Sequence, residues 1–76
     1  MGVPSRLTEM QRKFAEALIL YEGRKFDYEC AIEAGYEPNN ARPMASRLQN
    51  PEYSPLVVKY IGELREEQRN RFKVNY

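Results

Sequence analysis

The stretch 27–48 contains the feature that most restricts the fold. Two short runs with the apolar spacing of helices are separated there by a bend, with Gly35 at the end of the first run and Pro38 before the second. Glycine tolerates the left-handed backbone angles at which many helices end, and proline does not continue a helix. Ala31, four residues before Gly35, is small enough for the second helix to cross it closely, as in a helix-turn-helix. An ordinary helical hairpin in a small bundle fits the same spacing, so the pattern alone leaves both open.

The second helix of this pair, predicted over Asn39–Gln49, carries an apolar face and a polar face. Asn39 or Asn40 is expected to cap it, and Pro43 falls in its first turn, where a missing amide costs little. Its polar residue types are those that recognise base edges, arginine for guanine and asparagine or glutamine for adenine. Contact with DNA is favoured over the alternative, a solvated helix face without acidic residues. The side chains of this helix predicted to contact DNA are Asn39, Asn40, Arg42, Ser46, Arg47 and Gln49.

The connector 22–26 precedes the first helix of the pair. Arg24 and Lys25 lie side by side in it, and they serve either to grip a DNA phosphate or only to keep the loop soluble. Phe26 is expected to anchor the loop to the core. Asp27 is expected to cap the helix that follows, because its carboxylate suits the unpaired amides of a helix start.

Two further helices are predicted outside this stretch. Thr8 and Gln11 form the pattern of a capping box, and the helix they start is expected to run to about Tyr21. Ser54 followed by Pro55 is a strong helix start, and the last part of that helix is densely charged with mixed sign. The fold predicted is therefore a small all-α domain of about four helices containing a helix-turn-helix. We expect a flexible leader over 1–6, a DNA-binding domain over 7–53, and a fourth helix over 54–76 for oligomerisation or linkage.

Composition excludes several classes of function. One cysteine and no histidine rule out an internal disulfide, a zinc finger and a histidine general base. The sequence has no phosphate-binding glycine loop of the G-x-x-x-x-G-K type, so we expect no enzyme activity and no cofactor. It has no signal peptide and no apolar run long enough to cross a membrane, which favours the cytoplasm. A formal net charge of +1 argues against a polycation but leaves room for a local basic site.

Four short motifs together resemble those of small terminase subunits of tailed bacteriophages. The first is L-T-x-x-Q-x-x-F, the second A-I-x-A-G-Y, the third A-R and the fourth S-R-L-x-N-P. The resemblance covers most of residues 7–64. The motifs lie at Leu7–Phe14, Ala31–Tyr36, Ala41–Arg42 and Ser46–Pro51.

The resemblance implies a function and a set of partners. Family members are helix-turn-helix proteins that recognise the packaging start site of double-stranded viral DNA in the host cell cytoplasm. They present it to the large terminase subunit, the motor ATPase and nuclease, and they usually assemble into homo-oligomeric rings. Carried over by position, Asn39–Gln49 would be the recognition helix, with Arg42 and Arg47 as its leading basic residues.

This sequence departs from the family pattern in two places. Its loop 22–27 is longer and more basic than the segment that precedes the second helix in many members, and the chain ends at Tyr76, early for a full oligomerisation hairpin. Two other functions fit the same residues. A phage or bacterial transcription regulator would dimerise on a palindromic operator, whereas a protein-interaction module would bind only another subunit.

Overall fold

A computed structural model of the 76-residue chain describes residues 6–71 and contains four α-helices and one short 3₁₀ helix in that range. No strand occurs among these residues, so the predicted all-α class is confirmed. The predicted leader falls almost entirely outside the described residues, as does the end of the predicted fourth segment. The elements are α1 (Glu9–Leu20), α2 (Asp27–Ala34), η1 (Pro38–Asn40), α3 (Ala41–Leu48) and α4 (Pro55–Arg71).

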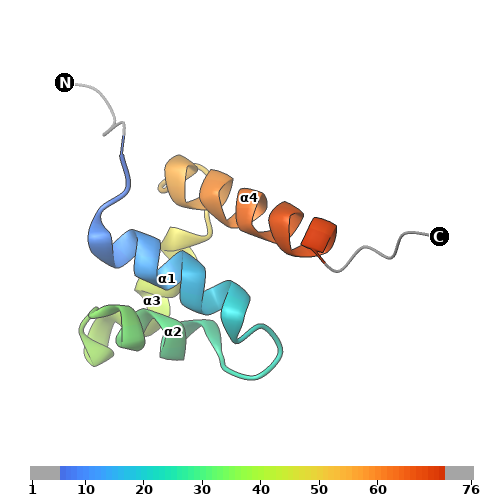
Figure 1. The fold of residues 1–76 in the computed structure, drawn as a ribbon. Coiled ribbons are helices and arrows are strands. Elements are labelled where there is room, and N and C mark those ends of the chain that lie inside the picture. Colours follow the sequence, from blue (N-terminus) through green and yellow to red (C-terminus); the bar gives the residue numbers. More distant parts are fainter. Residues whose placement is uncertain (1–5, 72–76) are drawn as a thin grey trace.

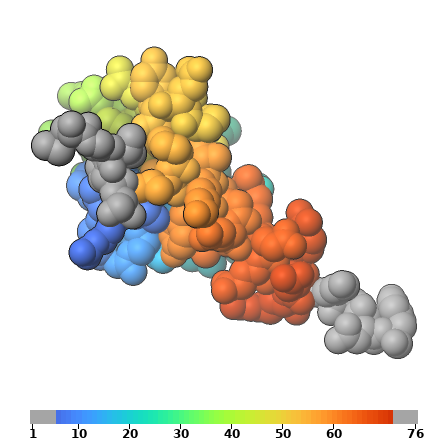
Figure 2. Space-filling view, turned by 90° about the horizontal axis from the view of Figure 1, so that it is seen from above, coloured from blue at the N-terminus to red at the C-terminus, as the bar shows by residue number. Residues whose placement is uncertain are grey.

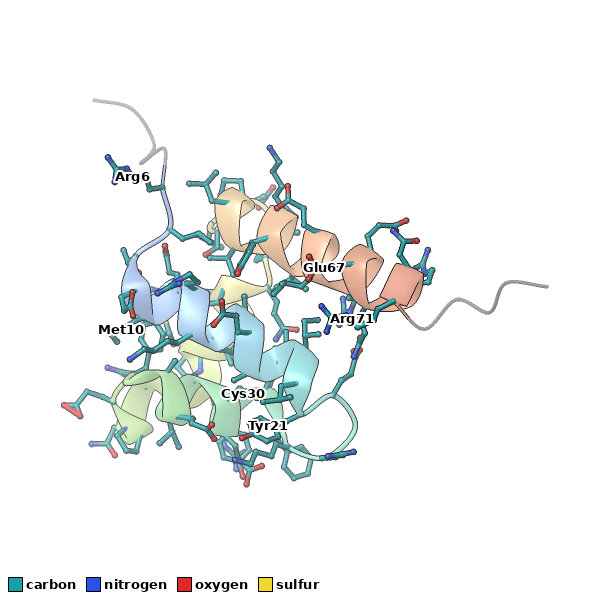
Figure 3. The ribbon with its side chains drawn as sticks, viewed as in Figure 1. Arg6, Met10, Tyr21, Cys30, Glu67 and Arg71 are labelled. Carbon is teal, nitrogen blue, oxygen red and sulfur yellow. The ribbon has the colours of Figure 1, made fainter. Side chains whose placement is uncertain are left out.

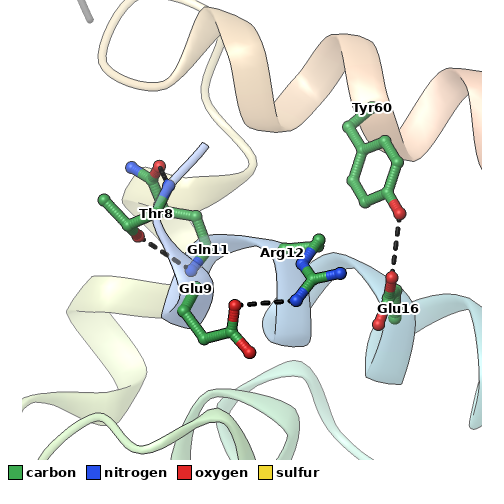
Figure 4. Close-up of polar contacts among 6 residues, drawn as sticks. All are labelled: Thr8, Glu9, Gln11, Arg12, Glu16 and Tyr60. Atoms are coloured by element: carbon green, nitrogen blue, oxygen red, sulfur yellow. Dashed lines mark hydrogen bonds and ion pairs between the residues drawn. The ribbon is translucent and has the colours of Figure 1, made fainter. Parts of the chain in front are cut away.

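The capping box that starts α1 is present as predicted. The Thr8 hydroxyl accepts a hydrogen bond from the Gln11 amide at 3.1 Å, and the Gln11 side chain accepts one from the Thr8 amide at 2.9 Å (Figure 4). Two amides that the first helical turn leaves without partners are thereby satisfied. The helix ends at Leu20, one residue before the predicted end, and Tyr21 caps its C-terminus.

Helix α1 lies between α4 on one side and the pair α2 and α3 on the other (Figure 1). A small core forms where these helices meet, and half of its members are alanines, which let helices approach closely. Phe14 on α1 is completely buried and is the largest side chain in that state. The buried residues are Phe14, Ala15, Ala17, Ile19, Cys30, Ala31, Ala34, Ala41, Ala45, Leu48, Val57 and Ile61.

The bend between α2 and α3 has the geometry expected at Gly35. Its φ is 112°, in the left-handed region, and the Tyr36 amide beyond it donates to the Ala31 carbonyl at 3.0 Å. Ala31 and Ala41, on the facing sides of the two helices, are both fully buried. The predicted close helix pair is therefore present, whereas its use as a DNA-binding helix-turn-helix stays a prediction.

The first half of α4 packs on α1, and its second half leaves the core. Val57 and Ile61 are buried, and the Tyr60 hydroxyl donates to a Glu16 carboxylate oxygen at 2.9 Å (Figure 4). Burial together with this hydrogen bond raises the pKa of Tyr60. Residues 65–71 are all exposed, and the end of α4 projects beyond the rest of the molecule (Figure 2). The densely charged last part of the predicted fourth helix is thus the part that lies outside the core.

Two expectations for the start of α2 are wrong. Phe26, not Asp27, is the N-cap residue, and its amide donates to the Glu29 side chain at 2.9 Å. Asp27 is instead the first residue of the helix, where a carboxylate still suits the positive end of the helix dipole. The Phe26 side chain does not anchor the loop, because it is 68% exposed and stacks on Tyr28 instead of entering the core.

Candidate nucleic-acid interface

The side of α3 that faces away from the core carries the residues predicted to contact DNA. Ala41, Ala45 and Leu48 turn toward the other helices and are buried. The six predicted contact residues are all exposed, with Asn39 and Asn40 in η1 and Gln49 at the C-cap of α3. The helix itself begins at Ala41, two residues later than the predicted start, because Pro38–Asn40 form a 3₁₀ turn. Asn40 occupies the N-cap position without a hydrogen bond from its side chain.

The two arginines of this face have no carboxylate beside them. No acidic residue occurs between Pro38 and Pro51, and neither Arg42 nor Arg47 forms an ion pair among residues 6–71. An arginine without a carboxylate partner keeps its full positive charge for an external anion. The exposed side of α3 is therefore a local basic surface on a chain that is almost neutral overall.

Arg42 lies against an aromatic ring. Its guanidinium carbon is 4.4 Å from the centroid of the Tyr28 ring, within the range of a cation–π contact. The Tyr28 ring is in turn stacked on that of Phe26, with centroids 5.8 Å apart and planes within 12° of parallel. Tyr28 and Phe26 come from the start of α2, so Arg42 on α3 is held by a neighbouring element.

Arg47 has a looser arrangement of the same kind. Its guanidinium carbon is 5.9 Å from the centroid of Tyr53, which is close to the outer limit of a cation–π contact. The Tyr53 residue is 70% exposed in the turn that follows α3. Arg47 is thus less restrained than Arg42 on the same face.

Gln49 holds α3 to α2. Its side-chain nitrogen donates to an Asp27 carboxylate oxygen at 2.9 Å and to the Ala45 carbonyl at 3.1 Å. Both hydrogens of the amide group therefore have acceptors within the protein. Gln49 would have to give up one of these bonds to donate to a base.

The two neighbouring cations of the loop before α2, Arg24 and Lys25, have different surroundings in the structure. The Lys25 ammonium is 2.6 Å from a Glu33 carboxylate oxygen and 4.2 Å from the centroid of the Tyr21 ring. This hydrogen bond raises the pKa of Lys25 and lowers the pKa of Glu33, so both stay charged and paired at neutral pH. Arg24 is exposed and forms no ion pair among residues 6–71. Of the two, Arg24 is the one whose charge is not already compensated.

Sequence reasoning missed the aromatic residues Phe26, Tyr28 and Tyr53 at this surface. The contacts Arg42–Tyr28 and Arg47–Tyr53 join different elements, so helical spacing within one element does not reveal them. A usable sign existed for Phe26 and Tyr28, which follow the basic residue Lys25 by one and three positions, but not for Tyr53, which is six positions from the nearest basic residue. Such interleaving of aromatic and basic residues is common at nucleic-acid surfaces.

Two further findings on the described residues concern metal ligands and the single cysteine. Residues 6–71 contain no group of three or more potential metal ligands. Cys30 lies inside the fold (Figure 3), and burial raises the pKa of its thiol, which disfavours the reactive thiolate. Cys30 therefore packs as a small buried residue of the core. In the same range, no helix has the length and apolar character needed to cross a membrane.

Comparison of the chain with protein-family models, with curated proteins and with solved structures finds no match.

Proposed function

We propose that this chain binds double-stranded DNA through the exposed face of α3. We further propose that it acts as the small terminase subunit of a tailed bacteriophage. In that role it is non-catalytic, recognises viral DNA for packaging and delivers it to the large terminase subunit. The four motifs between Leu7 and Pro51 support the specific role, and the surface of α3 supports DNA as the ligand.

The observation that carries the proposal is the contrast in how arginines are compensated. All three arginines of α4 lie beside carboxylates, whereas Arg42 and Arg47 on α3 lie over aromatic rings. Ion pairs between exposed side chains consume donors and charge that a phosphate would otherwise use. Among the arginines of these two helices, those of α3 are therefore the ones whose charge is not already compensated by a carboxylate.

Several copies acting together fit this proposal better than one. The α3 face is short, and a single copy makes few phosphate contacts, so one chain alone is expected to bind weakly. Linking several binding surfaces in one assembly raises the apparent affinity without any new contact. The homo-oligomer implied by the family resemblance would supply this.

The proposal is tested by fluorescence anisotropy with labelled duplex DNA over a series of salt concentrations. Binding is expected to fall steeply with salt, because each phosphate contact releases counterions. The matched control is Arg69→Ala, which removes one exposed arginine from α4 and should leave binding unchanged. Absence of binding at low salt, or binding that does not respond to salt, would favour the protein-interaction module.

Mass measurement by light scattering, with and without duplex DNA, separates the packaging subunit from the transcription regulator. A packaging subunit is expected to form an assembly larger than a dimer. A dimer that binds a palindromic duplex as one unit would instead support the regulator.

A further inference from the structure

Arg42 differs from four of the other arginines in what holds it. Arg12, Arg65, Arg69 and Arg71 are placed by carboxylates, which occupy some of their N–H donors. Arg42 is placed by the face of the Tyr28 ring, at 4.4 Å. The distinction matters because a carboxylate oxygen takes up an N–H donor of the guanidinium, whereas an aromatic ring offers no lone pair to accept one.

The donors of Arg42 remain unused within the described protein. No hydrogen bond or ion pair joins the Arg42 side chain to any acceptor among residues 6–71. The side chain is nevertheless restrained, because Tyr28 contacts it and the parallel ring of Phe26 lies beside Tyr28. An ordered guanidinium with its in-plane donors unoccupied is prepared for an external ligand that offers two acceptors side by side.

Two acceptor groups on DNA fit this description, the phosphate and the O6 and N7 edge of guanine. They differ in how much they benefit from an arginine whose orientation is already restrained. A phosphate presents several oxygens and carries no sequence information, so it can be met by an arginine in more than one orientation. The O6 and N7 atoms of guanine must be met by two donors in one plane, and fixing that plane beforehand reduces the entropy lost on binding. The restrained Arg42 is therefore suited to guanine, and the looser Arg47 to phosphate.

We infer that Arg42 is the specificity-determining residue of the α3 face and donates to the O6 and N7 edge of one guanine in the major groove. Tyr28, with Phe26 stacked on it, is a positioning residue that holds the Arg42 guanidinium for this contact. The inference rests on the proposed binding of duplex DNA by α3. It adds which side chain recognises a base and which residue of another helix sets its orientation.

The first experiment separates charge from planar geometry at position 42. A random duplex library is selected with the unaltered chain to find the preferred sequence, and binding to the best duplex and to its single-base variants is then measured. Arg42→Lys keeps the charge and loses the two-donor geometry. Its preference for guanine over other bases at one position is expected to fall about tenfold, while the salt dependence of its DNA binding stays the same.

Arg47→Ala is the comparison variant. It is expected to weaken binding to all duplexes by a similar factor and to reduce the salt dependence by about one phosphate contact. If Arg42→Ala behaves in this same uniform way, Arg42 is a phosphate contact and the inference is overturned.

The second experiment tests the positioning role of Tyr28. Tyr28→Phe keeps the ring and should retain the guanine preference. Tyr28→Leu should reduce this preference about threefold, which is less than the loss expected when Arg42 itself is replaced. Combining Tyr28→Leu with Arg42→Ala should reduce the preference no further than Arg42→Ala alone, because the ring acts through the arginine. Additive losses, with both variants folded by circular dichroism, would overturn the role of Tyr28.

The outcomes for the two proposals are distinct. A chain that binds no duplex contradicts the proposed function itself. A chain that binds duplexes with steep salt dependence but selects no guanine position leaves DNA binding intact and overturns only this inference. If Tyr28→Leu fails to fold, Arg42→Lys still tests the base contact, because its side chain is exposed.

Discussion

Helices α3 and α4 both expose arginines, but the side chains that lie beside these arginines differ between the two helices. On α4, Arg69 lies 3.4 Å from Glu66. Arg71 lies 3.8 Å from Glu67, and both residues of this pair are labelled in Figure 3. On α3, Arg42 and Arg47 have no acidic neighbour and lie over aromatic rings. The number of basic residues therefore does not identify the candidate site. What distinguishes the arginines of α3 is that aromatic rings, and not carboxylates, lie beside them.

The comparison also shows what each helix contributes to the fold. The buried side of α3 consists of small residues that pack closely on α2, and its other side is left exposed and polar. The second half of α4 buries little, and its exposed ion pairs each contribute less than about 1 kcal/mol to stability. Substitutions of arginine on either helix should therefore leave the fold intact, so their effects on binding can be compared directly.

The largest expected effect comes from removing both arginines of α3. Arg42→Ala combined with Arg47→Ala should weaken duplex binding by about 100-fold, because each lost contact to a base or phosphate is worth about tenfold. The matched control, Arg69→Ala with Arg71→Ala, removes the same charge from α4 and should change binding little. Anisotropy titrations of the two double variants measure this, with melting curves as a check on folding. Equal losses in both would mean that net charge alone, and not the α3 face, governs binding.

A second pair of variants compares two glycines, one at the α2–α3 bend and one inside α4. Gly35→Ala should destabilise the fold by about 1–2 kcal/mol, because its φ of 112° is strained for any residue with a side chain. Gly62→Ala should stabilise by about 0.5–1 kcal/mol, since an added methyl there meets no atom within 4 Å. Thermal unfolding followed by circular dichroism measures both. A Gly35→Ala variant that melts like the unaltered chain would show that this bend does not require glycine.

Placing one acidic side chain on α3 and one on α4 tests the contrast between the two helices through electrostatic repulsion of DNA phosphates. Ser46→Glu should weaken duplex binding about tenfold, because it brings a negative charge to the surface proposed to meet phosphates. Asn70→Glu adds the same charge near the end of α4 and should have little effect. Both residues are exposed, so folding should be retained. The contrast between the helices would be lost if Asn70→Glu weakened binding as much as Ser46→Glu.

The smallest expected effect separates the two cations of the loop before α2. Arg24→Ala should weaken binding about threefold, whereas Lys25→Ala should change it less, because Glu33 already compensates the Lys25 charge. Titrations at low salt, where exposed charges are least screened, give the clearest difference. A larger loss for Lys25→Ala would indicate that the Lys25–Glu33 pair opens on binding.

The features predicted correctly from the sequence are local. Thr8 and Gln11 are three residues apart, and Gly35 ends its helix through its own backbone angles, so neighbouring residues decide both. The first turn of α3 was also located closely, because Pro43 is tolerated only near a helix start.

The side-chain contacts around the candidate site were not predicted from the sequence. Phe26 was expected in the core because it is apolar, but it stacks on Tyr28 at the surface. The pairing of Lys25 with Glu33, eight residues away, could not be read from the spacing of either residue. The same holds for Arg42 over Tyr28, so the sequence located the exposed face of α3 without showing how its arginines are held.

The most direct test of the central claim is to map the DNA contact residue by residue. Backbone amide signals of the ¹⁵N-labelled chain are followed by NMR during titration with duplex DNA. The account predicts that the largest shifts occur at Asn39–Gln49 and at Tyr28, with little change over residues 62–71. Shifts concentrated on α4, or a saturated complex in which the signals of α3 do not move, would contradict it.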